Sequence, residues 1–276
     1  MEKLIKSPLN YTGNKYKLLP QILPLLPKDI NCFYDLFGGS GTVLFNCKAV
    51  EYIYNEINPL IKELVEYIAT CNCDTELDCI DKTIIVNDLG KEHKEQYYKF
   101  RELYNKNQNP RDLFILSCFS LNYQLRFNKS GKFNMTSGNR GFSANMRNNF
   151  VDFNNFAKIH NIKYENKSYM DFVEFKTDDF VYLDPPYLPT VTSYTENGLW
   201  NPQKEKELYS YLDILTNKNI KWALSNISVY RGLENKILNE WSSKYNIHKL
   251  NHKYNNNNCW KKDNTTQTQE VLITNY

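Results

Sequence analysis

Residues 32–41 read Cys-Phe-Tyr-Asp-Leu-Phe-Gly-Gly-Ser-Gly, an apolar run with one acidic residue that leads into closely spaced glycines. The run at 32–37 predicts a short buried strand, and the glycines predict a turn whose backbone can take positive φ angles and approach a ligand closely. No Gly-Lys-Ser/Thr follows, so the turn is not a P-loop, and its spacing differs from the dinucleotide fingerprint. Ligands of open α/β sheets lie beyond the carboxyl ends of strands, so this turn is a candidate ligand site.

Strand-like and helix-like runs alternate outward from this turn, which predicts an α/β sheet with helices on both faces. Residues 15–26 have helical leucine spacing, interrupted by Pro20 and Pro24. Residues 122–149 are polar and aperiodic, which is typical of a functional loop or a small subdomain, and 255–258 are an expected loop. We expect strands at 32–37, 52–54, 83–86, 162–164, 180–183, 220–224, 245–250 and 270–275, and helices at 42–49, 59–69, 91–107, 111–121, 203–216 and 233–241.

The composition narrows the class of protein. With 276 residues, of which 41% are hydrophobic, the chain can bury one large core or a core plus a small domain. No window approaches the roughly 18 apolar residues of a membrane span, and the N-terminus lacks a signal-peptide core, so we expect a cytoplasmic protein without a membrane partner. Cys71, Cys73 and Cys79 do not have a usual zinc spacing, which predicts reduced thiols and no metal.

Charge is unevenly distributed along the chain. The net charge is only +3, but residues 113–151 contain no acidic residue. Two interpretations stay open from this feature alone: a solvated basic loop, or a surface that follows phosphates and presents aromatic and amide groups to bases. The basic residues of the stretch are Arg126, Lys129, Lys132, Arg140 and Arg147.

The second predicted strand ends on an acidic residue, Glu56, fifteen positions after Gly41. A carboxylate at such a position can accept hydrogen bonds from both ribose hydroxyls of an adenosine group. Because nothing nearby suits phosphates, S-adenosylmethionine (AdoMet) fits this pattern better than NAD or ATP. A solvated strand end is the alternative interpretation of Glu56.

A second motif follows a later strand, where residues 181–187 read Val-Tyr-Leu-Asp-Pro-Pro-Tyr. Adenine N6 is a poor nucleophile until two acceptors hold its hydrogens and direct its lone pair at the methyl donor. Asp184 and the carbonyl of Pro185 can be those acceptors, and Pro186 helps to fix the direction of that carbonyl. Tyr187 can stack on a base that has left its helix. A strand-terminating turn is the plainer alternative.

Together these motifs resemble the Dam-like group of D12-class DNA N6-adenine methyltransferases, over nearly the whole chain. The motif order, with the glycine turn first and Asp-Pro-Pro-Tyr last, is that of the α group. The segments that carry the resemblance are Tyr11–Leu19, Asp35–Gly41, Glu56, Ser168–Tyr169, Asp184–Tyr187, Ser225–Asn226 and Glu270–Asn275.

The resemblance implies a Rossmann-like AdoMet-dependent methyltransferase sheet with a small inserted target-recognition domain. The expected domains are 1–90 with 150–276 for catalysis and 91–149 for recognition. The catalytic residues would be Asp184, Pro185, Pro186 and Tyr187. The cofactor-binding residues would be Tyr11, Lys15, Asp35, Phe37, Gly38, Gly39, Gly41, Glu56, Ser168, Tyr169 and Asp184.

The resemblance also implies that the basic segment within residues 113–151 binds double-stranded DNA. Arg126 falls on the arginine that reads a guanine in the GATC-specific members, and such a bidentate contact is worth about 1–3 kcal/mol of discrimination. Lys129 and Lys132 would meet phosphates. The expected DNA-binding residues are Asn122, Arg126, Asn128, Lys129, Lys132, Asn134 and Arg140.

Some positions depart from the family pattern. Asn10 stands where GATC-specific members have a DNA-contacting lysine, Thr136 stands where a proline is usual, and Asp35-Leu36-Phe37 replaces Glu-Pro-Phe. The first two departures bear on target choice, so GATC and another short target, as in restriction–modification or phage enzymes, both stay open. If the chain is a restriction–modification enzyme, a cognate restriction endonuclease is an expected partner.

Two other functions remain as alternatives. One is methyl transfer to a different acceptor, because related motifs serve cytosine N4, RNA adenine and glutamine amides. The basic segment disfavours a protein substrate. A non-catalytic DNA-binding subunit with a methyltransferase fold is the other, and the intact Asp184, Tyr187 and Glu56 argue against it.

Overall fold

The computed structural model describes residues 3–190, 200–251 and 268–276. The loop expected at 255–258 lies outside these ranges. Among the described helices, none has the length and apolar character needed to span a membrane.

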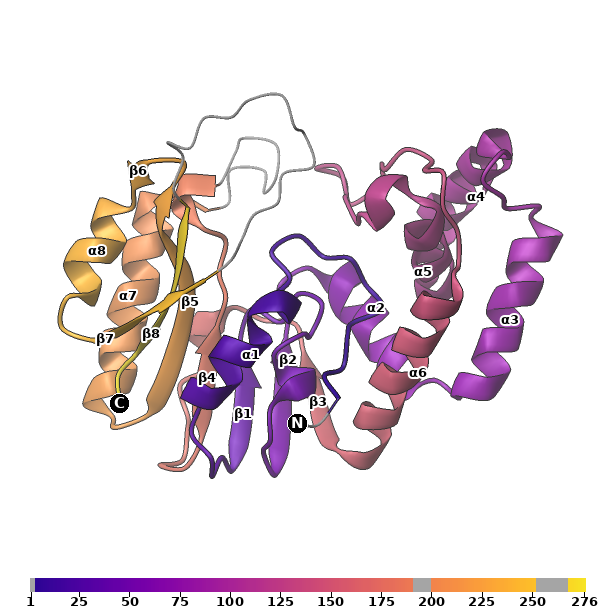
Figure 1. The fold of residues 1–276 in the computed structure, drawn as a ribbon. Coiled ribbons are helices and arrows are strands. Elements are labelled where there is room, and N and C mark those ends of the chain that lie inside the picture. The colour runs from indigo at the N-terminus through magenta and orange to yellow at the C-terminus, as the bar shows by residue number, and fades with distance from the viewer. Residues whose placement is uncertain (1–2, 191–199, 252–267) are drawn as a thin grey trace. The chain divides into compact units, whose positions relative to one another are not determined.

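The described residues form one eight-stranded sheet with the order β3-β2-β1-β4-β5-β8-β7, in which β6 pairs with β5 (Figure 1). Strand β4 pairs in parallel with β1 and with β5, and β8 pairs antiparallel with β5 and β7. The strands are β1 (Cys32–Asp35), β2 (Glu51–Asn55), β3 (Asn161–Glu165), β4 (Phe180–Leu183), β5 (Lys221–Tyr230), β6 (Leu233–Glu234), β7 (Asn246–Leu250) and β8 (Gln269–Thr274).

The chain divides into two compact units. The first unit comprises residues 1–16, 38–46 and 54–167, and the second comprises 17–37, 47–53 and 168–276. Strand β2 passes from the second unit into the first between Ile53 and Tyr54. The catalytic and recognition domains that the sequence suggested remain a proposal.

The second unit is built on the central strand β4, all of whose residues are buried. Such a continuous apolar run is typical of a parallel strand covered on both faces. Helices α7 (Pro202–Asn217) and α8 (Lys236–Ser242) pack on β5 (Figure 1). Their core includes Leu208, Leu212 and Trp222, which are fully buried.

The first unit is largely helical. It contains α2 (Pro59–Thr70), α3 (Cys73–Val86), α4 (Lys94–Asn107), α5 (Pro110–Phe119) and α6 (Ala144–Ile159). Helix α2 packs against α5, α6 and β3. Asn58 and Asn109 cap α2 and α5, each followed by proline in the first turn, which is the usual start of a helix.

The predicted strand at 83–86 is wrong, because these residues form the last turn of α3. Four β-branched residues gave the segment a strand pattern. Asn72 caps the helix by accepting from the Thr75 N–H, and the helix buries Leu77 and Ile80. Burial on the upstream part of the helix therefore outweighs the local preference, and Ile85 and Val86 stay exposed.

Two other predictions on this part of the chain are wrong. The helix expected at 42–49 is reduced to a 3-10 turn, Leu44–Asn46, because β2 already begins at Glu51 and leaves no room for more turns. The loop expected up to 149 ends at Ser143, which caps α6. Its buried positions Met146, Phe150 and Phe153 have helical spacing, but asparagines between them hid this pattern.

The other predicted elements are confirmed with small shifts of their ends, apart from the start of the helix expected at 233–241. Leu233 and Glu234 form strand β6 because they pair with the end of β5, and the helix begins at Lys236. The interrupted helix at 15–26 consists of a 3-10 turn at Tyr16–Leu18, helix α1 (Leu19–Ile22) and a 3-10 turn at Leu23–Leu25. Strand β5 is longer than expected, because it continues to Tyr230 and pairs there with β6.

Candidate active site

The glycine turn of the first unit is held by the end of β2. The Gly38 N–H donates to the carbonyl of Asn55 at 2.8 Å. The Gly39 N–H donates to Oε2 of Glu56 at 3.0 Å, and the Tyr54 hydroxyl donates to the Gly39 carbonyl at 2.6 Å. Both polar groups of Gly39 are therefore fixed by two residues of one neighbouring segment.

Side chains surround the turn so closely that glycine is required. A Cβ atom on Gly38 would lie 2.3 Å from a ring carbon of Tyr54. Gly39 has a φ of +50°, and a Cβ atom there would lie 3.1 Å from the ring of Tyr11. Packing against the rings of Tyr54 and Tyr11 therefore requires glycine at these two positions of the turn.

Glu56 is a buried carboxylate with two backbone donors. Its Oε1 accepts from the Asn58 N–H at 2.9 Å, and its Oε2 accepts from Gly39. Burial raises the pKa of this carboxyl above its ordinary value, although the backbone N–H groups offset part of the rise. A carboxylate oxygen can accept a second hydrogen bond, so ribose hydroxyls can still bind here.

The N-terminal motif lies beside the same turn. The Tyr11 ring packs against Gly39, and Asn14 Nδ2 donates to Ser40 Oγ at 3.3 Å. Lys15 is buried, and its Nζ donates to the Gly13 carbonyl at 2.6 Å. The first unit therefore brings together Tyr11, the glycines and Glu56, as the sequence predicted for a cofactor site.

Residues 126–134 form a small hairpin in the first unit, which we call the recognition hairpin. Phe127 and Phe133 face each other across it, flanked by bonds from Asn134 N–H to the Arg126 carbonyl and from Asn128 N–H to the Lys132 carbonyl. Asn128 Oδ1 also accepts from the Lys132 N–H at 2.9 Å, which closes the loop. Arg126, Lys129 and Lys132 are exposed on the hairpin, as DNA contacts would require.

The turn before the hairpin is strained. Tyr123 has a φ angle of 59°, an unusual conformation for so bulky a side chain, and it follows Asn122 at 55°, which asparagine adopts more readily. Asn10 Nδ2 donates to the Asn122 carbonyl at 2.7 Å, and the Arg140 guanidinium lies 5.3 Å from the centre of the Tyr123 ring. Asn10 therefore has a structural role at the position where the family pattern has lysine.

In the second unit, strand register brings two motifs to one edge of the sheet. Asp35, buried at the end of β1, pairs in parallel with Tyr182 of β4. Phe37 and Asp184, each two residues further on, therefore follow the carboxyl ends of neighbouring strands. The Phe37 ring lies 5.3 Å from that of Tyr169, whose short helix, Tyr169–Asp171, is capped by Ser168.

Asp184 is oriented by its own motif. The Tyr187 hydroxyl donates to Asp184 Oδ1 at 2.6 Å, and Pro185 is buried. Burial and then the Asp184 charge raise the pKa of Tyr187 well above its ordinary value, so its phenol stays protonated and acts as a donor. Stacking of Tyr187 on a base stays a prediction.

Comparison with known proteins agrees with these motifs. Residues 11–256 match the model of the D12 class N6 adenine-specific DNA methyltransferases. The chain belongs to this family. The resemblance inferred from the motifs is confirmed, and so is the α/β methyltransferase fold.

Three relatives illustrate the membership in this D12 family. Modification methylase StsI of Streptococcus sanguinis is 42% identical, over 100% of this chain and 43% of its own length. The type II methyltransferase M.FokI of Planomicrobium okeanokoites is 39% identical, over 99% and 43%. The DNA adenine methylase of Escherichia coli K12 is 28% identical, over 87% and 85%. The chain thus spans less than half the length of the first two relatives.

Two residues that the sequence did not suggest, Trp200 and Glu205, support the predicted site residue Phe37 in this D12 family member. Trp200 packs edge-on against Phe37, with ring centres 6.0 Å apart. Its Nε1 donates to Glu205 at 2.8 Å, and Glu205, which is fully buried, also accepts from Tyr209 and Asn235. Glu205 looks like an ordinary surface residue of an amphipathic helix, so nothing in the sequence marked it.

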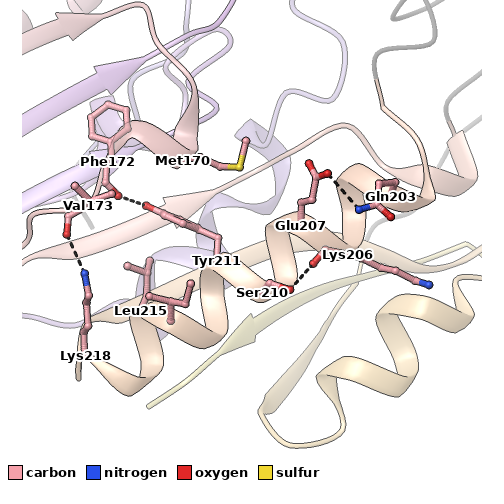
Figure 2. Close-up of a pocket in the computed structure, with 11 residues that line it drawn as sticks. Met170, Phe172, Val173, Gln203, Lys206, Glu207, Ser210, Tyr211, Leu215 and Lys218 are labelled. Atoms are coloured by element: carbon pink, nitrogen blue, oxygen red, sulfur yellow. Dashed lines mark hydrogen bonds between the residues drawn. The ribbon is translucent and has the colours of Figure 1, made fainter.

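The second unit also contains a hollow of about 450 Å³ along α7 (Figure 2). Tyr211 and Lys218 shape it by donating to the carbonyls of Phe172 and Val173. None of the residues that the sequence singled out lines it. The lining residues are Met170, Phe172, Val173, Gln203, Lys206, Glu207, Ser210, Tyr211, Ile214, Leu215 and Lys218.

We predict that Gly38→Ala lowers the free energy of unfolding by about 1–3 kcal/mol, because the new methyl group overlaps the buried Tyr54 ring. Urea unfolding measures this loss. Tyr54→Leu removes the ring that the new methyl group overlaps. The double variant should therefore lose about 1 kcal/mol less stability than the sum of the losses of the two single variants. Strictly additive losses would contradict the steric explanation.

Proposed function

We propose that this chain transfers a methyl group from AdoMet to N6 of adenine in a short duplex DNA target. The observation that carries the proposal is the Asp184 carboxylate at the end of β4, held by Tyr187 and followed by two prolines. Family membership supports it, because the matched model describes N6 adenine-specific DNA methyltransferases.

AdoMet fits the residues of the first unit. Three of the four residues of the turn are glycines, and each carboxylate oxygen of Glu56 can accept one further hydrogen bond, from a ribose hydroxyl. Tyr11 and Lys15 would enclose the ligand next to this turn. In the second unit, the neighbouring rings of Phe37 and Tyr169 would supply aromatic surface for an adenine. Asp35 and Ser168 remain proposed cofactor residues from the resemblance.

When bound, AdoMet supplies an electrophilic methyl group on a sulfonium. Asp184 and the Pro185 carbonyl would each accept one hydrogen of the target amine and so direct its lone pair. The positive charge that develops on nitrogen is stabilised by the Asp184 carboxylate, which can then accept the departing proton. Tyr187 would keep that carboxylate oriented and face the extruded base.

Recognition of DNA is proposed for the exposed basic and amide groups around the recognition hairpin. Arg126 would read a guanine, and Lys129, Lys132 and Arg140 would contact phosphates. The proposed setting is the cytoplasm of a bacterium or a phage-infected cell. A cognate restriction endonuclease is the proposed partner, in line with the names of the StsI and M.FokI modification enzymes.

Asp184→Ala should lower kcat for DNA methylation by about 10²–10⁴-fold and leave AdoMet affinity within about twofold. Asp184→Asn keeps one acceptor oxygen and should retain more activity. The measurements are single-turnover transfer of labelled methyl to DNA, with nucleoside analysis of the product, and calorimetric AdoMet binding. Activity near the wild-type level in Asp184→Ala would refute the mechanism.

AdoMet affinity should weaken as pH falls, by about tenfold per unit below the pKa of Glu56. Because that pKa is raised, the loss begins at a higher pH than for an ordinary glutamate, whose pKa is about 4.3. Calorimetry across pH measures this, and Glu56→Gln should bind weakly with a flat profile. Wild-type affinity that stays unchanged well below the ordinary glutamate pKa would exclude ribose binding by ionised Glu56.

Arg126→Ala should reduce discrimination between the target and a sequence with one guanine replaced, by about tenfold or more. AdoMet affinity should stay at the wild-type level. Lys129→Ala, on the same hairpin, should weaken binding to all duplexes alike and reduce the salt dependence. An unchanged target profile in Arg126→Ala would remove it from base recognition.

A further inference from the structure

Helix α4 holds the recognition hairpin through one asparagine. Asn105 Oδ1 accepts from the Phe133 N–H at 2.8 Å, and Asn105 Nδ2 donates to the Phe133 carbonyl at 3.1 Å. The side chain thus pairs with both polar groups of one residue, as a neighbouring strand would. Phe133 is 1% exposed, so these groups are buried and depend on protein partners.

The geometry of the hairpin explains why Phe133 faces Asn105. The bonds across the hairpin join the residues on either side of Phe127 and Phe133, so these two form a non-hydrogen-bonded pair. The N–H and carbonyl of Phe133 therefore point outward, away from Phe127, and Asn105 meets them there.

The pairing of Asn105 with Phe133 is connected to Arg126 through one further residue, Asn134. Asn134 follows Phe133 directly, and its N–H donates to the Arg126 carbonyl at 3.0 Å. Its Oδ1 accepts from Arg126 Nε at 2.9 Å. With Nε held in this way, the two terminal nitrogens of the guanidinium form the fork that suits O6 and N7 of guanine.

One face of α4 supports this arrangement. Tyr97 and Arg101 both donate to the carbonyl of Met135, at 3.2 and 3.0 Å, and the buried Tyr104 ring packs edge-on against Phe133. These residues and Asn105 follow helical spacing. Asn105 nevertheless differs from them, because it pairs with both the N–H and the carbonyl of a residue of the hairpin itself.

We propose that Asn105 is a positioning residue for target recognition, which fixes the recognition hairpin so that Arg126 meets the major-groove edge of one guanine. The proposal rests on the proposed function and extends it to a residue outside the DNA-contacting segment. Asn105 acts through Phe133 and Asn134.

The test uses duplexes in which each guanine of the target is replaced in turn by 7-deazaguanine, which lacks the N7 acceptor. For the wild-type protein, one position should lower kcat/KM by about tenfold or more. For Asn105→Ala, the same replacement should lower kcat/KM by less than about threefold, because the contact between Arg126 and the guanine is already weakened in this variant. AdoMet affinity should be unchanged.

Two further variants make the test specific. Asn107→Ala removes an exposed asparagine of the same helix and should keep the wild-type sensitivity to 7-deazaguanine. Asn105→Asp keeps the acceptor for the Phe133 N–H but loses the donor, so its sensitivity should lie between wild type and Asn105→Ala. Asn105→Asp also serves as the test variant if Asn105→Ala does not fold.

Different outcomes refute different claims. Full 7-deazaguanine sensitivity in both Asn105 variants would overturn the positioning role. Losses of activity and AdoMet affinity in equal proportion would show a merely structural role and would overturn it too. A wild-type protein that methylates no adenine in any duplex would instead refute the proposed function.

Discussion

The hydrogen bond from the Gly39 N–H to the buried Glu56 carboxylate is the constraint on which the glycine turn of the first unit depends. It fastens the glycine turn to the end of β2, and the Tyr54 hydroxyl completes the fastening at the Gly39 carbonyl. Because Tyr54 and Tyr11 pack against the turn, there is no room for a side chain at Gly38 or Gly39. One carboxylate thus shapes the turn and remains able to accept ligand hydroxyls.

The corresponding constraint in the second unit is the parallel register of β1 and β4. It makes Phe37 and Asp184 emerge at the same edge of the sheet, although they lie far apart in the sequence. The protonated phenol of Tyr187 then orients the Asp184 carboxylate. Buried Glu205 accepts a hydrogen bond from Trp200, and this bond holds the Trp200 ring against Phe37.

The sequence predicted local structure well at short, rigid turns. The places of the glycine turn, Glu56 and Asp184 after strand ends could be predicted, because a strand end and a few fixed neighbours determine them. Their roles remain a proposal. The sequence was misleading at 83–86, where burial of the upstream helix outweighed β-branched residues. The pairings of Asn105 with Phe133 and of Glu205 with Asn235 could not be foreseen, because the partners are 28 and 30 positions apart in ordinary polar sequence.

The most direct test of the central claim is a modification map. The chain would be expressed in a host free of DNA methylation, and the host DNA sequenced with single-base detection of N6-methyladenine. The account predicts that one short motif is methylated throughout the genome, and the motif itself would show whether Asn10 and Thr136 accompany a target other than GATC. A folded, AdoMet-binding protein that leaves every adenine unmodified would contradict the account.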